Sequence, residues 1–196
     1  MDNFFGPFLA RVAPGNCVLD LGAGQGTQAQ WMARRGALVT AVDKKMPPSG
    51  LAGIDWIQSS IEDWFARLPA EARFDAILAK NVFQFLNRDW VLQQLLPDLA
   101  ARLNPGGLMG IETFYQPPEP AFEWLTETAH YTLADLSAFF FNWKVLSKQQ
   151  QPVRTRGLDG VKRKFFLTDL IVQRQAASAA QALAPAIEIT EEFLSL

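Results

Sequence analysis

The sequence predicts an α/β protein whose sheet is doubly wound and mostly parallel. Three observations support this fold class: short apolar runs alternate with segments of helical periodicity, a glycine cluster follows the first apolar run, and two apolar runs lie close together near the end of the chain. A chain of 196 residues suffices for one domain with a complete core. We therefore expect a single domain over 1–175 and an alanine-rich, then acidic tail over 176–196.

Glycines and prolines divide the first half of the chain into its expected elements. A short helix or cap over 3–12 precedes the first apolar run, and Gly36 is a plausible C-cap for the helix that follows that run. The stretch 44–54 holds two prolines and two glycines, so we expect no full helix there, and Pro69 ends the next helix. The expected strands are 17–21, 38–42, 55–59 and 74–79, and the expected helices are 26–35 and 61–68.

A long amphipathic segment opens the second half. Leucines recur at helical spacing over 89–103, and Pro97 inside this stripe should kink or divide the helix. The sequence Asn-Pro-Gly-Gly at 104–107 indicates a turn before a fifth strand over 108–114. Three prolines within 116–120 then break the alternation of strands and helices.

The last elements are a helix and a pair of strands. Thr132 and Asp135 form a capping pattern, which predicts a helix over 133–141. The closing strands, expected at 142–149 and 163–173, are near enough in sequence to pair as an antiparallel hairpin at the edge of the sheet. A polar, basic loop is expected between them.

Composition excludes several classes of protein. The net charge of −2 and the isoelectric point near 5.4 give no overall attraction to nucleic acid or anionic lipid. The single cysteine, Cys17, precludes an internal disulfide, provides no metal-ligand spacing and is expected to be a buried thiol. No basic leader begins the chain, and no apolar run approaches the ~18 residues of a membrane span. We expect a cytoplasmic protein without metal, membrane or nucleic-acid partners.

The glycine cluster is the most informative segment. Residues 18–26 read Val-Leu-Asp-Leu-Gly-Ala-Gly-Gln-Gly, and such a loop between a strand and a helix lets a ligand approach bare backbone at the helix N-terminus. A dinucleotide loop requires a small residue at position 27, which is Thr27 here, so a nicotinamide-dependent oxidoreductase is a disfavoured alternative. Asp20, at the start of the loop, suits the cationic amino end of a ligand that has no phosphate.

Asp43 adds a second feature of a nucleoside site. It ends the second expected strand, 19 residues after Gly24, where a carboxylate can accept hydrogen bonds from both hydroxyls of a ribose. Two such bonds to a charged acceptor contribute roughly 3–5 kcal/mol together. The loop and the acid together predict a cofactor that carries a ribose.

These segments resemble the class I S-adenosylmethionine-dependent methyltransferases. The resemblance rests on five segments in the family's order, which are 18–26, 39–45, 56–64, 74–86 and 103–107. It implies a Rossmann-like, mostly parallel seven-stranded sheet with an antiparallel C-terminal hairpin strand. Residues 82–91, 131–146 and 165–174 are similar to the tellurite-resistance TehB-type branch of this family.

The resemblance also implies roles for individual residues. Gly22, Ala23 and Gly24 would line the amino-acid arm of S-adenosylmethionine, with Asp20 near its amino group. Asp43, followed by Lys44, would bind the ribose, and Ser60 and Ile61 would contact the adenine. Many members have an aspartate at position 60, and a serine bonds the adenine amino group more weakly. Lys80 would lie beside the sulfonium, where a lysine is unexpected.

The acceptor is expected to be a small molecule, and the sequence shows no obvious general base for it. The only histidine, His130, is expected to be structural, and 80–83 lacks the Asn-Pro-Pro-Tyr pattern of enzymes that methylate adenine or glutamine amides. Aromatic residues expected at the strand ends, either facing the acceptor or packing in the core, are Phe83, Phe85, Phe114, Tyr115 and Trp124. Basic residues of the hairpin, opposed only by Asp159, are Arg154, Arg156, Lys162, Arg163 and Lys164.

Several functional hypotheses follow. The candidates for catalytic contacts with an anionic acceptor are Lys80, Arg154, Arg156 and Arg163. The favoured hypothesis is methyl transfer to a small molecule such as the chalcogen oxyanions tellurite or selenite. The alternatives are an O- or S-methyltransferase of a small organic metabolite and a non-catalytic relative that binds the cofactor. Phe4, Phe5 and Phe8 are expected to close over the cofactor or to lie in an interface such as that of a homodimer.

Overall fold

A single seven-stranded sheet organises the computed structural model, which describes residues 5–47, 49–122, 127–157 and 159–176. The strands are β1 (Cys17–Leu21), β2 (Leu38–Asp43), β3 (Ile54–Gln58), β4 (Phe74–Lys80), β5 (Leu103–Glu119), β6 (Lys144–Arg156) and β7 (Lys162–Gln173). Their order across the sheet is β3-β2-β1-β4-β5-β7-β6. β1 to β5 pair in parallel, whereas β7 runs antiparallel to both β5 and β6. The predicted fold class, including the antiparallel C-terminal hairpin, is confirmed.

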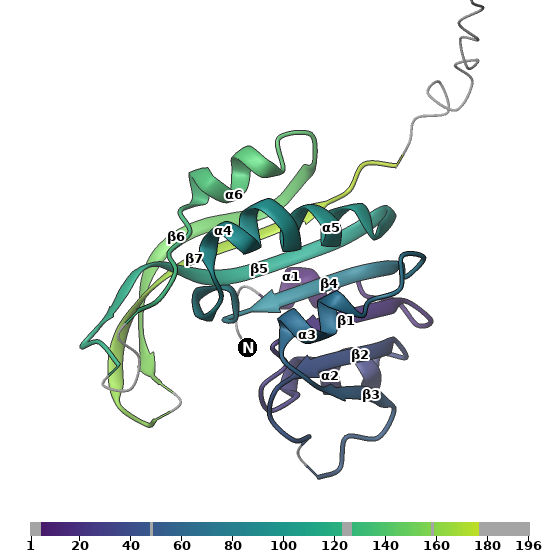
Figure 1. The fold of residues 1–196 in the computed structure, drawn as a ribbon, viewed down its shortest axis with the longest axis horizontal. Coiled ribbons are helices and arrows are strands. Elements are labelled where there is room, and N and C mark those ends of the chain that lie inside the picture. The colour runs from purple at the N-terminus through teal and green to yellow at the C-terminus, as the bar shows by residue number, and fades with distance from the viewer. Residues whose placement is uncertain (1–4, 48, 123–126, 158, 177–196) are drawn as a thin grey trace, which may run out of the picture.

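Helices cover both faces of this sheet (Figure 1). They are α1 (Phe5–Leu9), α2 (Thr27–Arg34), α3 (Ile61–Ala66), α4 (Arg88–Trp90), α5 (Leu96–Ala101) and α6 (Leu133–Phe139). Two separate apolar clusters show which face each helix covers. One cluster joins α1 and α2 to the sheet through Phe8 and Met32, and the other joins α3, α5 and α6 through Trp64, Leu99 and Leu136. The helices therefore form one layer on each face of the sheet, as in a doubly wound α/β fold.

The chain leaves β1 toward β2 and β3 on one side, and β4 and β5 pair on the other side of β1. The strand order therefore reverses between β1 and β4. In open α/β sheets, ligands bind at the carboxyl ends of the strands beside such a reversal. In this chain those ends are the glycine loop after β1, Asp43 at the end of β2 and Lys80 at the end of β4.

The predicted interruption of the long leucine-rich helix is confirmed. A π-helical turn, Val91–Leu95, separates α4 from α5, and Pro97 lies in the first turn of α5. The N–H groups in the first turn of a helix have no partner within the helix, so a proline, which lacks an N–H, is tolerated there. The wider π-helical turn that precedes Pro97 also accommodates the proline ring. The expectation of no helix over 44–54 also holds for the described residues of that stretch.

The last three strands are longer than the sequence predicts. The expected turn at 104–107 lies within β5, because Arg174 N donates to Gly107 O and Gly106 N donates to Arg174 O. β5 also continues past the expected break at 116–120, since it pairs with β7 through two register shifts that tolerate prolines. β6 reaches Arg156, so most of the expected basic loop is strand. Figure 1 shows β5, β6 and β7 extending together beyond the other strands and curving.

Two expectations for the N-terminal part of the chain are wrong. Phe5 and Phe8 are completely buried, and a Cβ on Gly110 would lie 2.9 Å from Phe8 Cδ2, so these rings pack on β5 rather than covering a ligand or an interface. Phe4 lies outside the described residues. The Cys17 side chain is exposed, because Cys17 is the first residue of β1 and lies at the open end of that strand.

Other expectations stay predictions. All of the expected tail over 176–196 except residue 176 lies outside the described residues, so the division into a domain over 1–175 and a tail is not tested. In the part of the chain that the structure covers, no helix has both the length and the apolar character needed to cross a bilayer.

Candidate functional site

The glycine loop presents its backbone at one position and packs tightly at another. Gly22 and Gly24 have φ angles of +67° and +59°, which side chains rarely adopt. A Cβ on Gly22 would lie 2.5 Å from Cγ2 of Val82, so this glycine allows the loop to pack against the segment after β4. A Cβ on Gly24 would meet only Gly22 O, at 3.9 Å. Gly24 therefore faces open space, where a ligand can reach the backbone.

Asp43 is held beside this loop by its own carboxylate. Its Oδ2 accepts a hydrogen bond from Gly24 N at 2.8 Å, and its Oδ1 accepts one from Lys45 N at 2.8 Å. A carboxylate oxygen has capacity for a further hydrogen bond. The side chain is thus oriented by the backbone and is still able to accept the two hydroxyls of a ribose.

Asp20 is a buried carboxyl at the base of the loop. It is 2% exposed, and its Oδ2 has no hydrogen-bond partner among the described residues. Burial raises the pKa of Asp20 from 3.8 to about 7, and the negative charge of Asp43 adds to the rise, whereas a hydrogen bond from the Ala29 backbone and the charge of Lys80 oppose it. A cationic group beside Asp20 would favour its ionised form.

The other residues expected to contact the cofactor differ in how accessible their side chains are. Ser60 caps α3, since its hydroxyl oxygen accepts a hydrogen bond from Asp63 N at 3.0 Å, which leaves its O–H free to act as a donor. Ile61 and Ala23 are buried, and Lys44 is exposed. The structure thus brings Asp20, Gly24 and Asp43 together, whereas the side chain of Ile61 packs in the core.

Four polar side chains form a line across four neighbouring strands, hereafter the polar row. Its members are Lys80 on β4, Glu112 on β5, Asp169 on β7 and Gln149 on β6, each directly opposite the next in the strand register. Lys80 Nζ donates to Glu112 Oε1 at 2.6 Å, and Gln149 Nε2 donates to Asp169 Oδ2 at 2.6 Å. Glu112 and Asp169 are each 3% exposed. Two buried carboxylates are therefore cross-strand neighbours.

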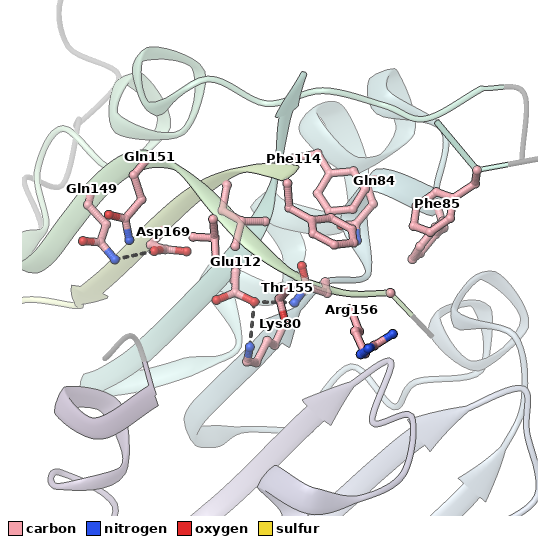
Figure 2. A pocket seen from close by; sticks show the side chains of 16 residues that line it. Lys80, Gln84, Phe85, Glu112, Phe114, Gln149, Gln151, Thr155, Arg156 and Asp169 are labelled. Atoms are coloured by element: carbon pink, nitrogen blue, oxygen red, sulfur yellow. Dashed lines mark hydrogen bonds and ion pairs between the residues drawn. The ribbon is translucent and has the colours of Figure 1, made fainter. Parts of the chain in front are cut away.

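The polar row lies along a cavity of about 640 Å³, hereafter the strand cavity (Figure 2). Side chains on one face of β5, β7 and β6 line it, together with the segment that follows β4. Its apolar walls include Phe85, Phe114, Phe122, Phe165 and Leu167. Asn81, with a φ of +55°, also lines it and donates to the same Glu112 oxygen as Lys80. A volume of this size accommodates a small organic molecule.

The strand cavity and the glycine loop meet at the end of β4. Lys80 lines the cavity, and its charge acts on Asp20 beneath the glycine loop. Val82, two residues further, packs against Gly22. A ligand on the loop and a ligand in the cavity would thus approach each other near 80–82.

The basic residues of the hairpin lie together along a second depression, and one of them, Arg156, also lines the strand cavity. The five residues are Arg154, Arg156, Lys162, Arg163 and Lys164. Arg156 lines the strand cavity and donates to Gly160 O at 2.7 Å. Arg163 is buried, pairs with Asp159 at 2.6 Å, donates to Pro120 O and lies 4.5 Å from the centre of the Phe122 ring. Arg154, Lys162 and Lys164 line this depression but not the strand cavity.

Some of the expected aromatic residues line the strand cavity, and others pack elsewhere. Phe85 and Phe114 line the strand cavity, whereas Phe83 is buried in the core and Tyr115 stacks edge-on against Phe166. Trp124 lies outside the described residues. The imidazole of His130 contacts the Thr128 hydroxyl at 2.9 Å, away from the strand cavity, and burial lowers the pKa of His130.

Sequence reasoning missed Glu112, Asp169 and Gln149. The first two are charged residues inside strand segments, 108–114 and 165–172, that are mostly apolar. A carboxylate in a buried strand is rare unless it is paired or functional, so these two positions carried a usable signal. Gln149 carried no such signal, because glutamines occupy all of 149–151.

Comparisons with known proteins identify the family. A family model described as a methyltransferase domain matches residues 1–151. The ubiquinone biosynthesis O-methyltransferase of Aeromonas salmonicida is 27% identical over 112 residues, which are 54% of this chain and 46% of that protein. The trans-aconitate 2-methyltransferase of Azoarcus sp. is 30% identical over 118 residues, which are 57% and 44% of the two chains. The chain spans about half the length of the curated relatives it matches.

Solved structures agree on the fold. TehB from Haemophilus influenzae aligns with a TM-score of 0.67 at 20% identity, which covers 85% of this chain and 60% of TehB. The magnesium protoporphyrin IX methyltransferase of Synechocystis, with S-adenosylmethionine bound, aligns with a TM-score of 0.60 at 16% identity, over 86% and 75% of the two chains. The open backbone at Gly24, the orphaned oxygen of Asp20 and the oriented carboxylate of Asp43 fit that cofactor. The chain belongs to the methyltransferase domain family, with the class I fold for which S-adenosylmethionine is the cofactor.

Proposed function

We propose that the protein transfers a methyl group from S-adenosylmethionine to a small organic acceptor bound in the strand cavity. One observation carries the proposal: the glycine loop with Asp20 and Asp43 meets a cavity of about 640 Å³ at the end of β4. Substrate and cofactor sites that adjoin at one strand end are the arrangement that a direct transfer between two small molecules requires.

The residues of the loop side would hold the cofactor in a fixed orientation. Asp43 would accept the ribose hydroxyls, and Asp20 would lie near the cationic amino group, as its orphaned oxygen suggests. Ser60 would donate its O–H to the adenine, because its oxygen already accepts from Asp63 N. When bound, S-adenosylmethionine supplies a methyl group on a positively charged sulfur, which is already activated for transfer.

The residues of the cavity side would orient the acceptor and exclude water. The phenylalanine walls favour an acceptor with an apolar body, and aligning the reacting groups can contribute roughly 7 kcal/mol or more to lowering the barrier. The carboxylates of Glu112 and Asp169 lie in the same cavity, where either can accept a proton from an O–H or N–H group. An O-methyltransferase of a small metabolite is consistent with this lining.

The chalcogen oxyanion suggested by the sequence resemblance is the second candidate. Arg156 at the cavity and the similarity in fold to TehB favour it. Against it, Lys80 is already paired with Glu112, and Arg163 with Asp159. The homodimer and the cytoplasmic location stay predictions.

Two measurements test the proposed function. Calorimetry with S-adenosylhomocysteine reports on the loop site, and we expect binding that NADH does not reproduce. A screen with radiolabelled methyl donor, covering phenols, amines, thiols, small carboxylic acids, tellurite and selenite, then identifies the acceptor. Folded protein that fails to bind S-adenosylhomocysteine would rule out the proposal, whereas binding without transfer to any acceptor would favour the non-catalytic alternative.

A further inference from the structure

The end of the β6–β7 hairpin brings like charges together across its two strands. In the antiparallel register, Arg154 lies directly opposite Lys164, and Arg156 lies directly opposite Lys162. Residues directly opposite in such a pair have Cβ atoms about 5 Å apart, and like charges there destabilise the pairing. Two successive like-charge pairs therefore work against this end of the hairpin, and an anion bound between them would offset the repulsion.

The four cations of these pairs project from one face of the hairpin. Side chains alternate along a strand, and the strand cavity is lined by Val153 and Thr155 on β6 and by Phe165 on β7. The even-numbered cations beside them therefore point to the opposite face, where they line the second depression, of about 580 Å³. Arg156, the last residue of β6, lines both hollows.

The lining of the second depression carries an excess of positive charge. Its fifth cation, Arg163, is 4% exposed and pairs with Asp159 at 2.6 Å. The carboxylate among the described lining residues is Glu119, which lies opposite Lys164 in the pairing of β5 with β7. Glu119 and Asp159 offset two of the five cations, so three positive charges remain.

We infer that the second depression binds a small ligand that carries a chain of linked phosphate groups. Positions two apart on a strand are roughly 7 Å apart, so the two like-charge pairs follow each other along the hairpin. A phosphate chain can contact both pairs, whereas a single phosphate contacts one. The volume of the depression is that of a small-molecule site, and a net charge of −2 gives no overall attraction to nucleic acid. The inference goes beyond the proposed function and does not depend on it.

Protection of the sheet edge is the competing explanation for these charges. β6 is the outer strand of the sheet, and positive side chains on an edge strand oppose its pairing with a second sheet. That role requires charge along the edge alone. It does not require the inner strand β7 to carry Lys162 and Lys164 opposite the arginines of β6.

Three inorganic probes test the site: orthophosphate, pyrophosphate and tripolyphosphate. Each is titrated by calorimetry into the full chain at low ionic strength without divalent cations. We expect tripolyphosphate to bind about 10-fold or more tightly than orthophosphate, with pyrophosphate between them, and to bind more weakly as salt is added. Equal affinities for the three probes overturn the inference. Displacement of tripolyphosphate by S-adenosylhomocysteine also overturns it, because the glycine loop would then be the site.

Two further titrants identify the source of the phosphate chain. ATP that binds more tightly than tripolyphosphate indicates a nucleotide, and ATP that binds equally or less tightly indicates recognition of the phosphate chain alone. Either result supports the site. A single-stranded oligonucleotide of about 20 residues that binds more tightly than both, at the same salt concentration, overturns the assignment to a small ligand.

A double variant tests the residues themselves. Arg154→Gln with Lys162→Gln removes one exposed cation from each like-charge pair. Tripolyphosphate affinity should fall about 10-fold or more, whereas the melting temperature of the ligand-free protein should stay the same or rise, because the repulsion is relieved. The matched control, Lys144→Gln with Lys148→Gln, removes two exposed cations from β6 at least roughly 20 Å from Arg154 along the strand, and should bind within about 3-fold of wild type.

The outcomes separate a ligand site from a general effect of charge. Equal losses of affinity in the test and control variants overturn the inference, and so does a test variant that binds within 3-fold of wild type. The exchange Arg154→Lys with Lys162→Arg keeps both charges and should retain binding even if the glutamine variant is less stable; loss of binding in this exchange contradicts recognition by charge. Absence of tripolyphosphate binding, together with self-association of the glutamine variant, would assign the cations to edge protection and leave the proposed function intact.

Discussion

The loop side and the cavity side of the site are built from different chemical groups. On the loop side, backbone around Gly24 and a strand-end carboxylate, Asp43, come from one short stretch of sequence. On the cavity side, side chains from four strands meet only because β5, β7 and β6 pair in one register. A backbone-built site is therefore visible in a local sequence pattern, whereas a site built from side chains depends on strand pairing that no local pattern specifies.

The largest expected effect is on the loop side, at Asp43. Asp43→Ala removes the acceptor for Gly24 N and for the expected ribose hydroxyls. Two hydrogen bonds to a charged acceptor amount to roughly 3–5 kcal/mol, so S-adenosylhomocysteine affinity should fall about 100-fold or more by calorimetry. Asp55→Asn, which removes an exposed carboxylate from β3, is the control. An affinity within 3-fold of wild type would show that Asp43 does not bind the ligand.

Replacing the two loop glycines by alanine should affect stability and cofactor affinity to different extents. In Gly22→Ala, the new Cβ would lie 2.5 Å from Val82 in a strained backbone, which should lower the free energy of unfolding by about 2–4 kcal/mol. The melting temperature should then fall by about 5–15 °C. In Gly24→Ala, the Cβ meets open space, so the loss should be smaller in stability and larger in cofactor affinity. Equal losses in both variants would contradict a ligand-facing Gly24.

The pH dependence of cofactor binding should follow the ionisation of Asp20 on the loop side. The pKa of Asp20 is raised to about 7 by burial, so the neutral acid predominates below that pH in the ligand-free protein. A cationic amino group requires the ionised form, and S-adenosylhomocysteine affinity should fall by up to about 10-fold for each pH unit below 7. Asp20→Asn should bind more weakly at pH 8 and lose most of this dependence. An unchanged dependence in the variant would assign it to another group.

The same group has the opposite effect on the stability of the ligand-free protein. The pKa of Asp20 is higher in the folded protein than in the unfolded chain, so the folded protein binds more protons between about pH 4 and 7. The stability that this proton uptake provides is therefore lost as the pH rises through that window. We expect Asp20→Asn to raise the melting temperature at pH 8 more than at pH 5. Thermal unfolding at the two pH values is the measurement.

The sequence predicted the fold and the positions of the loop-side residues for a physical reason, whereas the contacts of those residues with a cofactor stay predictions. The positions of β1, β2 and β4 follow from apolar runs that stop at glycine or charged residues, and the same stops place Gly24, Asp43 and Lys80 at strand ends. On the cavity side, the sequence named Lys80, Phe85, Phe114 and Arg156, which line the cavity, but not the rest of the polar row. It missed the rest because β5 and β6 continue through prolines and polar residues that locally favour a turn or loop. Pairing with β7 stabilises these segments as strands, and the polar row appears only in that register.

The smallest effects are expected on the KM for the acceptor, when each of three arginines of the hairpin is replaced by alanine. The sequence gave these three arginines the same expected role. Side chains alternate across a strand, so Arg154 faces away from the neighbours Val153 and Thr155 that line the cavity. Arg154→Ala should leave the KM for the acceptor within about 2-fold, since exposed surface positions rarely matter by more than 0.5 kcal/mol. Arg156→Ala should change it by several-fold, because Arg156 lines the cavity.

Arg163→Ala should act through its neighbour Phe122. The guanidinium lies 4.5 Å from the centre of that ring, which forms part of the cavity wall, and truncation leaves the ring without this support. We expect a several-fold higher acceptor KM together with unchanged S-adenosylhomocysteine affinity, because Arg163 contacts Asp159, Pro120 and Phe122 rather than the glycine loop. Phe122→Leu should reproduce the change in KM with the arginine in place. If Arg154→Ala instead had the largest effect of the three, the face of β6 assigned to the acceptor would be the wrong one.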